Sequence, residues 1–113
     1  MKKTRSHDLV GDRSKYDFGK CTYAKGWAQV DTSQDASYYG TWCNPTTFEL
    51  MSYCEGDVTH TQCDNEDEFT AEVRELAHWN KERGYWSGID AGLKTEPDMR
   101  QRFVQLGLED LLH

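Results

Sequence analysis

The sequence predicts an α+β domain, in which a four-stranded antiparallel β-meander is followed by two helices packed on one face of the sheet. The chain has 113 residues, of which 36% are hydrophobic and 12% aromatic, which suits one domain with one core. Short strand-like runs separated by turn residues fill its first half, and helical periodicity begins after residue 63. Because strands and helices come in blocks, α+β is favoured over a doubly wound sheet.

The domain boundaries follow from composition. Residues 1–17 are polar and basic and lack periodicity, so they predict a flexible basic N-terminal tail, or an arm that orders on a partner. Residues 18–113 form the single α+β domain. The chain has no apolar run of about 18 residues and its beginning lacks an apolar leader segment, so neither a membrane span nor export is expected.

The β-region shows short runs bounded by turn signals. Strands are predicted at residues 20–30, 38–43, 46–54 and 58–63. Residues 31–37 have a loop composition, Asn44–Pro45 is a turn signal, and Glu55-Gly56 supports a tight hairpin. These short connections predict antiparallel pairing of neighbours in sequence order.

The second half predicts two helices. The first covers residues 64–84, with a cap at Asp64 or Asn65, acids in its first turn and Gly84 at its end. The second covers residues 95–107. The side chains expected to face the core are Phe69, Val73, Leu76, Ala77, Met99, Phe103 and Leu106. The last residues, LEDLLH, should dock back on the core.

The hairpin decides whether the cysteines and a nearby histidine can form a site. A two-residue turn at Glu55-Gly56 pairs Cys54 with Asp57, which leaves Cys63 six residues further along the ladder, at about 20 Å. A disulfide needs Cα atoms within about 7 Å. The same register puts His60 on the opposite sheet face from both cysteines. We therefore expect no disulfide between them, no metal site and no cofactor.

One face of the predicted sheet is unusually rich in large side chains. It carries Tyr38, Trp42, Glu49, Met51, Tyr53 and His60. Either other segments cover this face, or it binds a partner or a ligand. Glu49 and His60 lie diagonally, within reach of a hydrogen bond, which is the minimum for general acid–base chemistry. No nucleophile falls beside them, so a cross-strand ion pair explains both, and we predict no catalytic residues.

A candidate recognition loop follows the first helix. Tyr85 and Trp86 stand beside glycines in residues 84–94, a composition common in binding loops. In the alternative reading, Trp86 and Ile89 fill the gap between the two helices.

Charge is unevenly distributed along the chain, whose net charge is −7. Residues 1–25 carry seven basic and three acidic residues, whereas residues 26–113 carry six and seventeen. A folded body of this charge repels phosphate backbones, so we expect a protein partner with a basic surface rather than nucleic acid. The acidic residues predicted to meet that partner are Glu55, Asp57, Asp64, Glu66, Asp67, Glu68, Glu72 and Glu75. Solubility alone is the competing explanation of these charges.

Part of the chain resembles a known group of proteins. The run YYGTWCNPTTFELMSYCEGDV, the triplet GID at residues 88–90 and the terminal LGLEDLLH are similar to small proteins, without an assigned activity, carried by phages, plasmids and bacterial genomes. The likeness covers residues 18–113. It implies a bacterial or mobile-element origin, and no functional residue is transferred by it. The cytoplasm of the bacterial host is the expected compartment, because no leader segment is apparent and four cysteines would stay reduced there.

Three functions are compatible with these observations. The first is a stoichiometric acidic protein-binding module, such as a mobile-element inhibitor of a host defence complex whose nucleic-acid-binding surface it occupies by partial mimicry. The second is a small-molecule-binding or minor enzymatic domain that uses His60 and Glu49 on the aromatic face. The third is a structural subunit of a homo-oligomer, for which a homodimer is one form. The sequence favours a binding protein over an enzyme.

Overall fold

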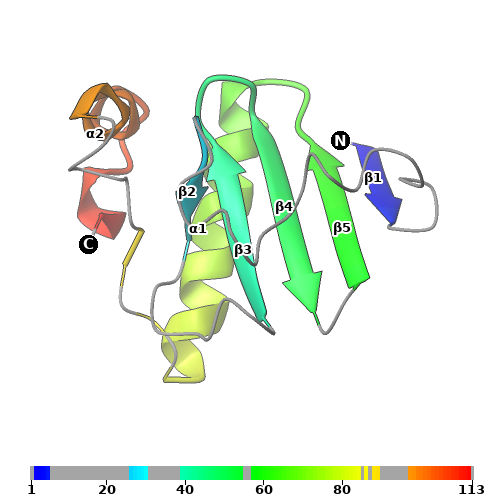
Figure 1. The fold of residues 1–113 in the computed structure, drawn as a ribbon. Helices are drawn as coiled ribbons and strands as arrows, with labels where there is room; N and C mark the ends of the chain where they lie inside the picture. The colour runs from blue at the N-terminus through cyan, green and yellow to red at the C-terminus, as the bar shows by residue number, and fades with distance from the viewer. Residues whose placement is uncertain are drawn as a thin grey trace.

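A computed structural model describes residues 2–5, 26–30, 39–54, 57–84, 86, 88–89 and 97–112. It confirms the α+β class: an antiparallel sheet of five strands with two α-helices and a short 3-10 helix (Figure 1). The strands are β1 Lys2–Arg5, β2 Ala28–Gln29, β3 Tyr39–Asn44, β4 Glu49–Cys54 and β5 Asp57–Gln62. The helices are α1 Glu66–Glu82, α2 Pro97–Gln105 and η3 Glu109–Leu111.

The sheet has one strand more than predicted. Its order is β1-β5-β4-β3-β2, so β2 to β5 form the expected meander and β1 adds a fifth strand at the β5 edge. β1 comes from the predicted flexible tail, and it pairs antiparallel with residues 59–62 of β5. An uncovered β5 edge would expose unpaired backbone groups, and β1 satisfies them while its exposed Lys2 and Lys3 discourage further pairing. The remainder of the predicted tail, residues 6–17, lies outside the described residues.

The predicted hairpin register is confirmed. Cys54 lies opposite Asp57 and Met51 opposite His60. The ladder continues past the strand ends, because the amide of Cys63 donates to the carbonyl of Phe48 at 3.0 Å. The β4–β5 register is therefore the predicted one, whereas Glu55 and Gly56 themselves lie outside the described residues.

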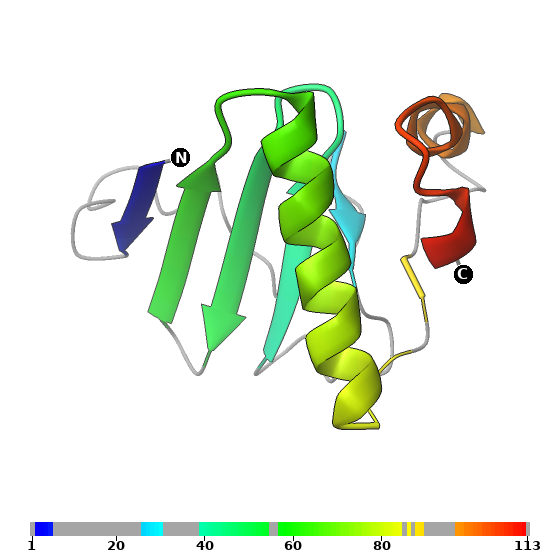
Figure 2. The same ribbon diagram turned by 180° about the vertical axis from the view of Figure 1, so that it is seen from behind.

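Helix α1 covers one face of the sheet and buries Phe69, Val73 and Ala77 in the core (Figure 2). It begins at the N-cap Asn65, whose side chain accepts a hydrogen bond from the Glu68 amide at 2.9 Å. It ends before Gly84, whose φ of 76° is easy for glycine alone.

Helix α2 is placed differently from the prediction. Figures 1 and 2 show it beyond the β2 edge of the sheet, with η3 beside it, rather than next to α1 on the same face. Its buried Met99, Phe103 and Leu106 still enter the same core cluster, as predicted. Within the described residues, no helix is both long and apolar enough to cross a membrane.

The C-terminal residues dock back as predicted. Leu108 and Leu111 are buried in the core, and Ile89 forms a parallel bridge with Leu112. Arg74 of α1 fastens this segment through Asp110, described below.

Candidate functional site

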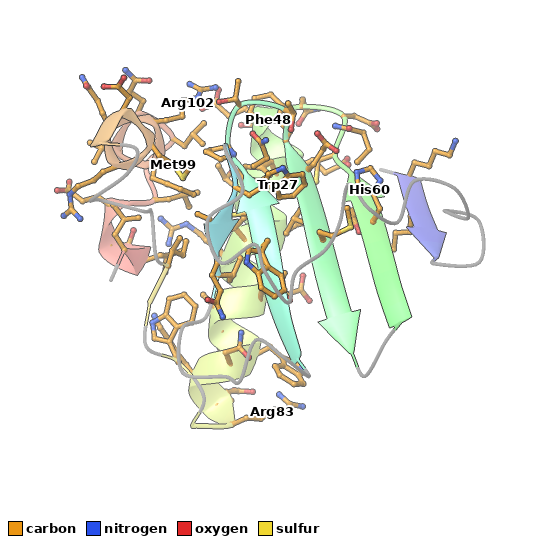
Figure 3. The ribbon with its side chains drawn as sticks, viewed as in Figure 1. Trp27, Phe48, His60, Arg83, Met99 and Arg102 are labelled. Carbon is orange, nitrogen blue, oxygen red and sulfur yellow. The ribbon has the colours of Figure 1, made fainter. Side chains whose placement is uncertain are left out.

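The two central side chains of the aromatic sheet face are buried. Trp42 and Met51 have no solvent exposure, although α1 lies on the opposite face. The Trp42 ring lies along its own strand over Gly40, where an added Cβ would be only 2.7 Å from a ring carbon. Figure 3 shows Trp27 on this same front side of the sheet. Trp42 and Met51 therefore contribute packing and present no surface to a partner.

The remaining aromatic residues of that face are only partly described. Tyr38 lies outside the described residues, and of Tyr53 only the backbone is described, opposite Val58. The structure brings together one predicted pair on this face, Glu49 and His60.

Glu49 and His60 form the expected diagonal contact. Nε2 of His60 is 2.7 Å from Oε2 of Glu49, and the two side chains are 16% and 19% exposed. In the β4–β5 ladder Gln62 lies opposite Glu49 and Met51 lies opposite His60. On the other side of β5, strand β1 places Thr4 opposite His60, so the added strand brings one hydroxyl-bearing residue beside the pair that the sequence analysis did not include. The pair can hold and orient a proton, and its geometry also suits a simple cross-strand link between β4 and β5.

The cysteines of known placement are buried packing residues. Cys43 and Cys63 are free thiols, and no group of three metal-binding side chains occurs among the described residues. Burial raises the pKa of Cys43, and burial followed by the charges of Glu68 and Glu72 raises the pKa of Cys63 to about 11. Both thiols therefore stay protonated and weakly nucleophilic at neutral pH. The confirmed register keeps Cys54 away from Cys63, as predicted.

The predicted acidic residues divide into three groups. Glu55 lies outside the described residues, and only the backbone of Asp57 is described. Asp64, Glu66 and Asp67 lie exposed at the start of α1. Further along the helix Glu75 is exposed, and Glu68 and Glu72 are partly exposed. Glu68 also accepts a hydrogen bond from the Asp64 amide at 3.2 Å, so it helps to cap α1.

The solvent side of α1 carries a regular row of side chains, here called the outer face of α1. Its members are Glu68, Glu72, Glu75, Trp79 and Glu82. The spacing alternates between four and three residues, which keeps the row on one side of a helix. The helical period puts this row about 130° around α1 from the row that α1 buries. Glu75, Trp79 and Glu82 are exposed, whereas Glu68 and Glu72 are partly exposed.

Trp79 is the residue of this face that the sequence analysis missed. It is 46% exposed, and Val104 is the other large hydrophobic side chain exposed among the described residues. The guanidinium of Arg83 lies 3.8 Å from the centre of its ring and donates to the Trp79 carbonyl at 3.2 Å. Extending the helical period outward through residues 68, 72 and 75 would have found it.

The candidate recognition loop is only partly described. Tyr85 lies outside the described residues. Trp86 is half-buried against the core, with the Lys81 ammonium 5.5 Å from its ring centre, and Ile89 is fully inside the core. These positions support the packing alternative for Trp86.

Comparison of the chain with family models, with curated proteins and with solved structures gives no match.

Proposed function

We propose that this protein is a binding module that holds a basic protein partner on the outer face of α1. The observation that carries the proposal is the exposed Trp79 in line with four carboxylates. Tryptophan is strongly enriched among residues that dominate binding energy.

The charges of this face specify the partner. Glu68, Glu72 and Glu75 are separated by four and three residues, or about 6 and 4.5 Å along the helix axis. Such a row of carboxylates attracts a surface rich in arginine and lysine and accelerates its association. The Arg83 guanidinium over Trp79 is an internal example of the cation–π contact that an incoming arginine would make.

A more specific form of the proposal is inhibition of a nucleic-acid-binding protein, in which these carboxylates stand in for phosphates. It rests on the acidity of the described surface and on the resemblance noted from the sequence. The enzymatic alternative has less support, because Trp42 and Met51 are buried beside the Glu49–His60 pair.

The proposal is tested by capturing partners from a bacterial lysate at low and moderate salt, then measuring the affinity of the purified pair. We expect Trp79→Ala to weaken binding by about 2 kcal/mol, or roughly 30-fold in Kd. Glu72→Gln with Glu75→Gln should weaken it and reduce its salt dependence.

A control double variant changes the net charge by the same amount at positions away from the outer face of α1. Asp98→Asn with Glu109→Gln neutralises two exposed acids that lie outside α1 and outside the acidic residues predicted to meet the partner, and should leave the affinity within about twofold. If both double variants weaken binding equally, the interaction is only unspecific charge attraction. If Trp79→Ala leaves the affinity unchanged, Trp79 does not contribute to binding.

A further inference from the structure

A hollow of about 400 Å³ lies between α2 and the turn that joins β3 to β4. Its volume falls in the range of small-ligand sites. Pro45 and Met99 form part of its wall, but both are buried, so the surface that faces the hollow is mainly polar. The side chains of Gln101 and Gln105 add amide groups to the α2 side.

The turn on the other side of the hollow is held rigidly. Oδ1 of Asn44 accepts hydrogen bonds from the amides of Thr46 at 3.0 Å and Thr47 at 3.1 Å. Phe48 closes the turn with a φ of 61°, a conformation that bulky residues rarely adopt. Its ring packs 5.6 Å from that of Phe69, which helps to hold the strained backbone in place.

Arg102 connects α2 to this turn across the hollow (Figure 3). Its Nε donates to the carbonyl of Pro45 at 3.2 Å, and its guanidinium carbon lies 6.0 Å from the centre of the Phe48 ring. These contacts hold the guanidinium in position and use one of its five donors. Its Nη groups make no hydrogen bond within the described part of the chain, so they can bind a carboxylate through two hydrogen bonds.

Asp98 supplies the opposite charge one helical turn away. The spacing of four residues brings side chains on a helix within ion-pair reach, yet no ion pair joins Asp98 to Arg102 among the described residues. A cation and an anion therefore line the same hollow without neutralising each other.

We propose that this hollow binds a small zwitterion, namely a free α-amino acid, for which leucine serves as the probe. Arg102 would hold its carboxylate and Asp98 its ammonium group. A simple anion would meet repulsion from Asp98, and a simple cation would meet repulsion from Arg102. The site is separate from the outer face of α1 and does not rest on the proposed function.

The test is a titration of the 15N-labelled full chain with leucine, leucinamide and N-acetyl-leucine, followed by NMR. We expect leucine to shift the amides of Gly26 and Thr46, which line the hollow. Leucinamide lacks the carboxylate and N-acetyl-leucine lacks the ammonium group, so each should bind about tenfold more weakly. No saturable shift with leucine up to millimolar concentration, or equal binding of the three compounds, would overturn the proposal.

Variants separate the two charged contacts. Arg102→Gln should weaken leucine binding about tenfold, whereas Arg100→Gln, the same charge change on the same helix outside the hollow, should leave it within about twofold. Asp98→Asn should remove the preference for leucine over N-acetyl-leucine. Asp98 is exposed, so this variant should fold even where Arg102→Gln does not, and a preference that persists in it would refute the assigned ammonium contact.

Discussion

Replacing Gly40 by alanine tests whether the aromatic sheet face is packed in solution. An ideal Cβ at Gly40 would lie 2.7 and 2.8 Å from two carbons of the Trp42 ring, whereas carbon atoms normally pack at about 3.5–4.0 Å. The overlap is about 1 Å, and Trp42 is fully buried, so the ring cannot swing into solvent. Overpacking of this kind costs about 1–3 kcal/mol.

The backbone contribution has the opposite sign. Gly40 does not have a positive φ, so alanine fits its conformation and should stabilise the strand by about 0.5–1 kcal/mol. The difference of these two contributions predicts that Gly40→Ala lowers the free energy of unfolding by about 0–2.5 kcal/mol. An open face, on which Trp42 could move aside, would instead make the substitution stabilising.

The assay is equilibrium unfolding in urea followed by far-UV circular dichroism, which does not depend on Trp42 fluorescence. The matched background is Trp42→Leu, which removes the ring and costs stability by itself. In that background Gly40→Ala should be neutral or stabilising. A stabilising Gly40→Ala in the native background, or an equal loss in both backgrounds, would refute the packing of Trp42 over Gly40.

The remaining two predictions concern the Cys63 thiol and the hydrogen bonds of Arg74. Because the pKa of Cys63 rises from its usual 9.0 to about 11 on folding, the unfolded thiol loses its proton first, so stability should fall as the pH rises from 9 to 11. The urea midpoint of unfolding should fall less over this pH range in Cys63→Ala than in the native protein. An identical fall in both proteins would show that Cys63 does not cause the pH dependence. Arg74 donates to both carboxylate oxygens of Asp110 at 3.0 Å and to the Gly107 carbonyl at 2.7 Å, which also lowers the pKa of Asp110. Lysine in Arg74→Lys cannot form these three hydrogen bonds, so amide hydrogen exchange should accelerate at Leu108 and Leu111 but not at Val73. Unchanged exchange at the two leucines would show that Arg74 does not hold the C-terminal segment.

The hairpin and the helix boundaries could be predicted because their causes are local. The turn signal in the sequence predicted the β4–β5 register, and with it the Glu49–His60 contact and the separation of Cys54 from Cys63. Asn65 begins α1 by accepting a hydrogen bond from the Glu68 amide, and Gly84 follows its end with a positive φ, so both causes lie within a few residues.

The position of α2 and the pairing of β1 required the tertiary structure. The apolar spacing of residues 99, 103 and 106 shows that α2 buries one side, but it does not say which part of the sheet that side meets. In β1, residues 2–5 read as a charged tail, and only the unpaired edge of β5 supplies the hydrogen bonds that make them a strand.

For the candidate sites, the sequence by itself determined which side chains share a surface, and the tertiary structure decided which of those surfaces are open. Periodicity places Trp42 and Met51 on one sheet face and Trp79 on one side of α1, because side-chain direction follows from the backbone. Burial depends instead on what packs against each surface from elsewhere in the chain. That is why Trp42 is enclosed and Trp79 is exposed, and why the hollow at Arg102 exists only where α2 meets a turn more than fifty residues earlier.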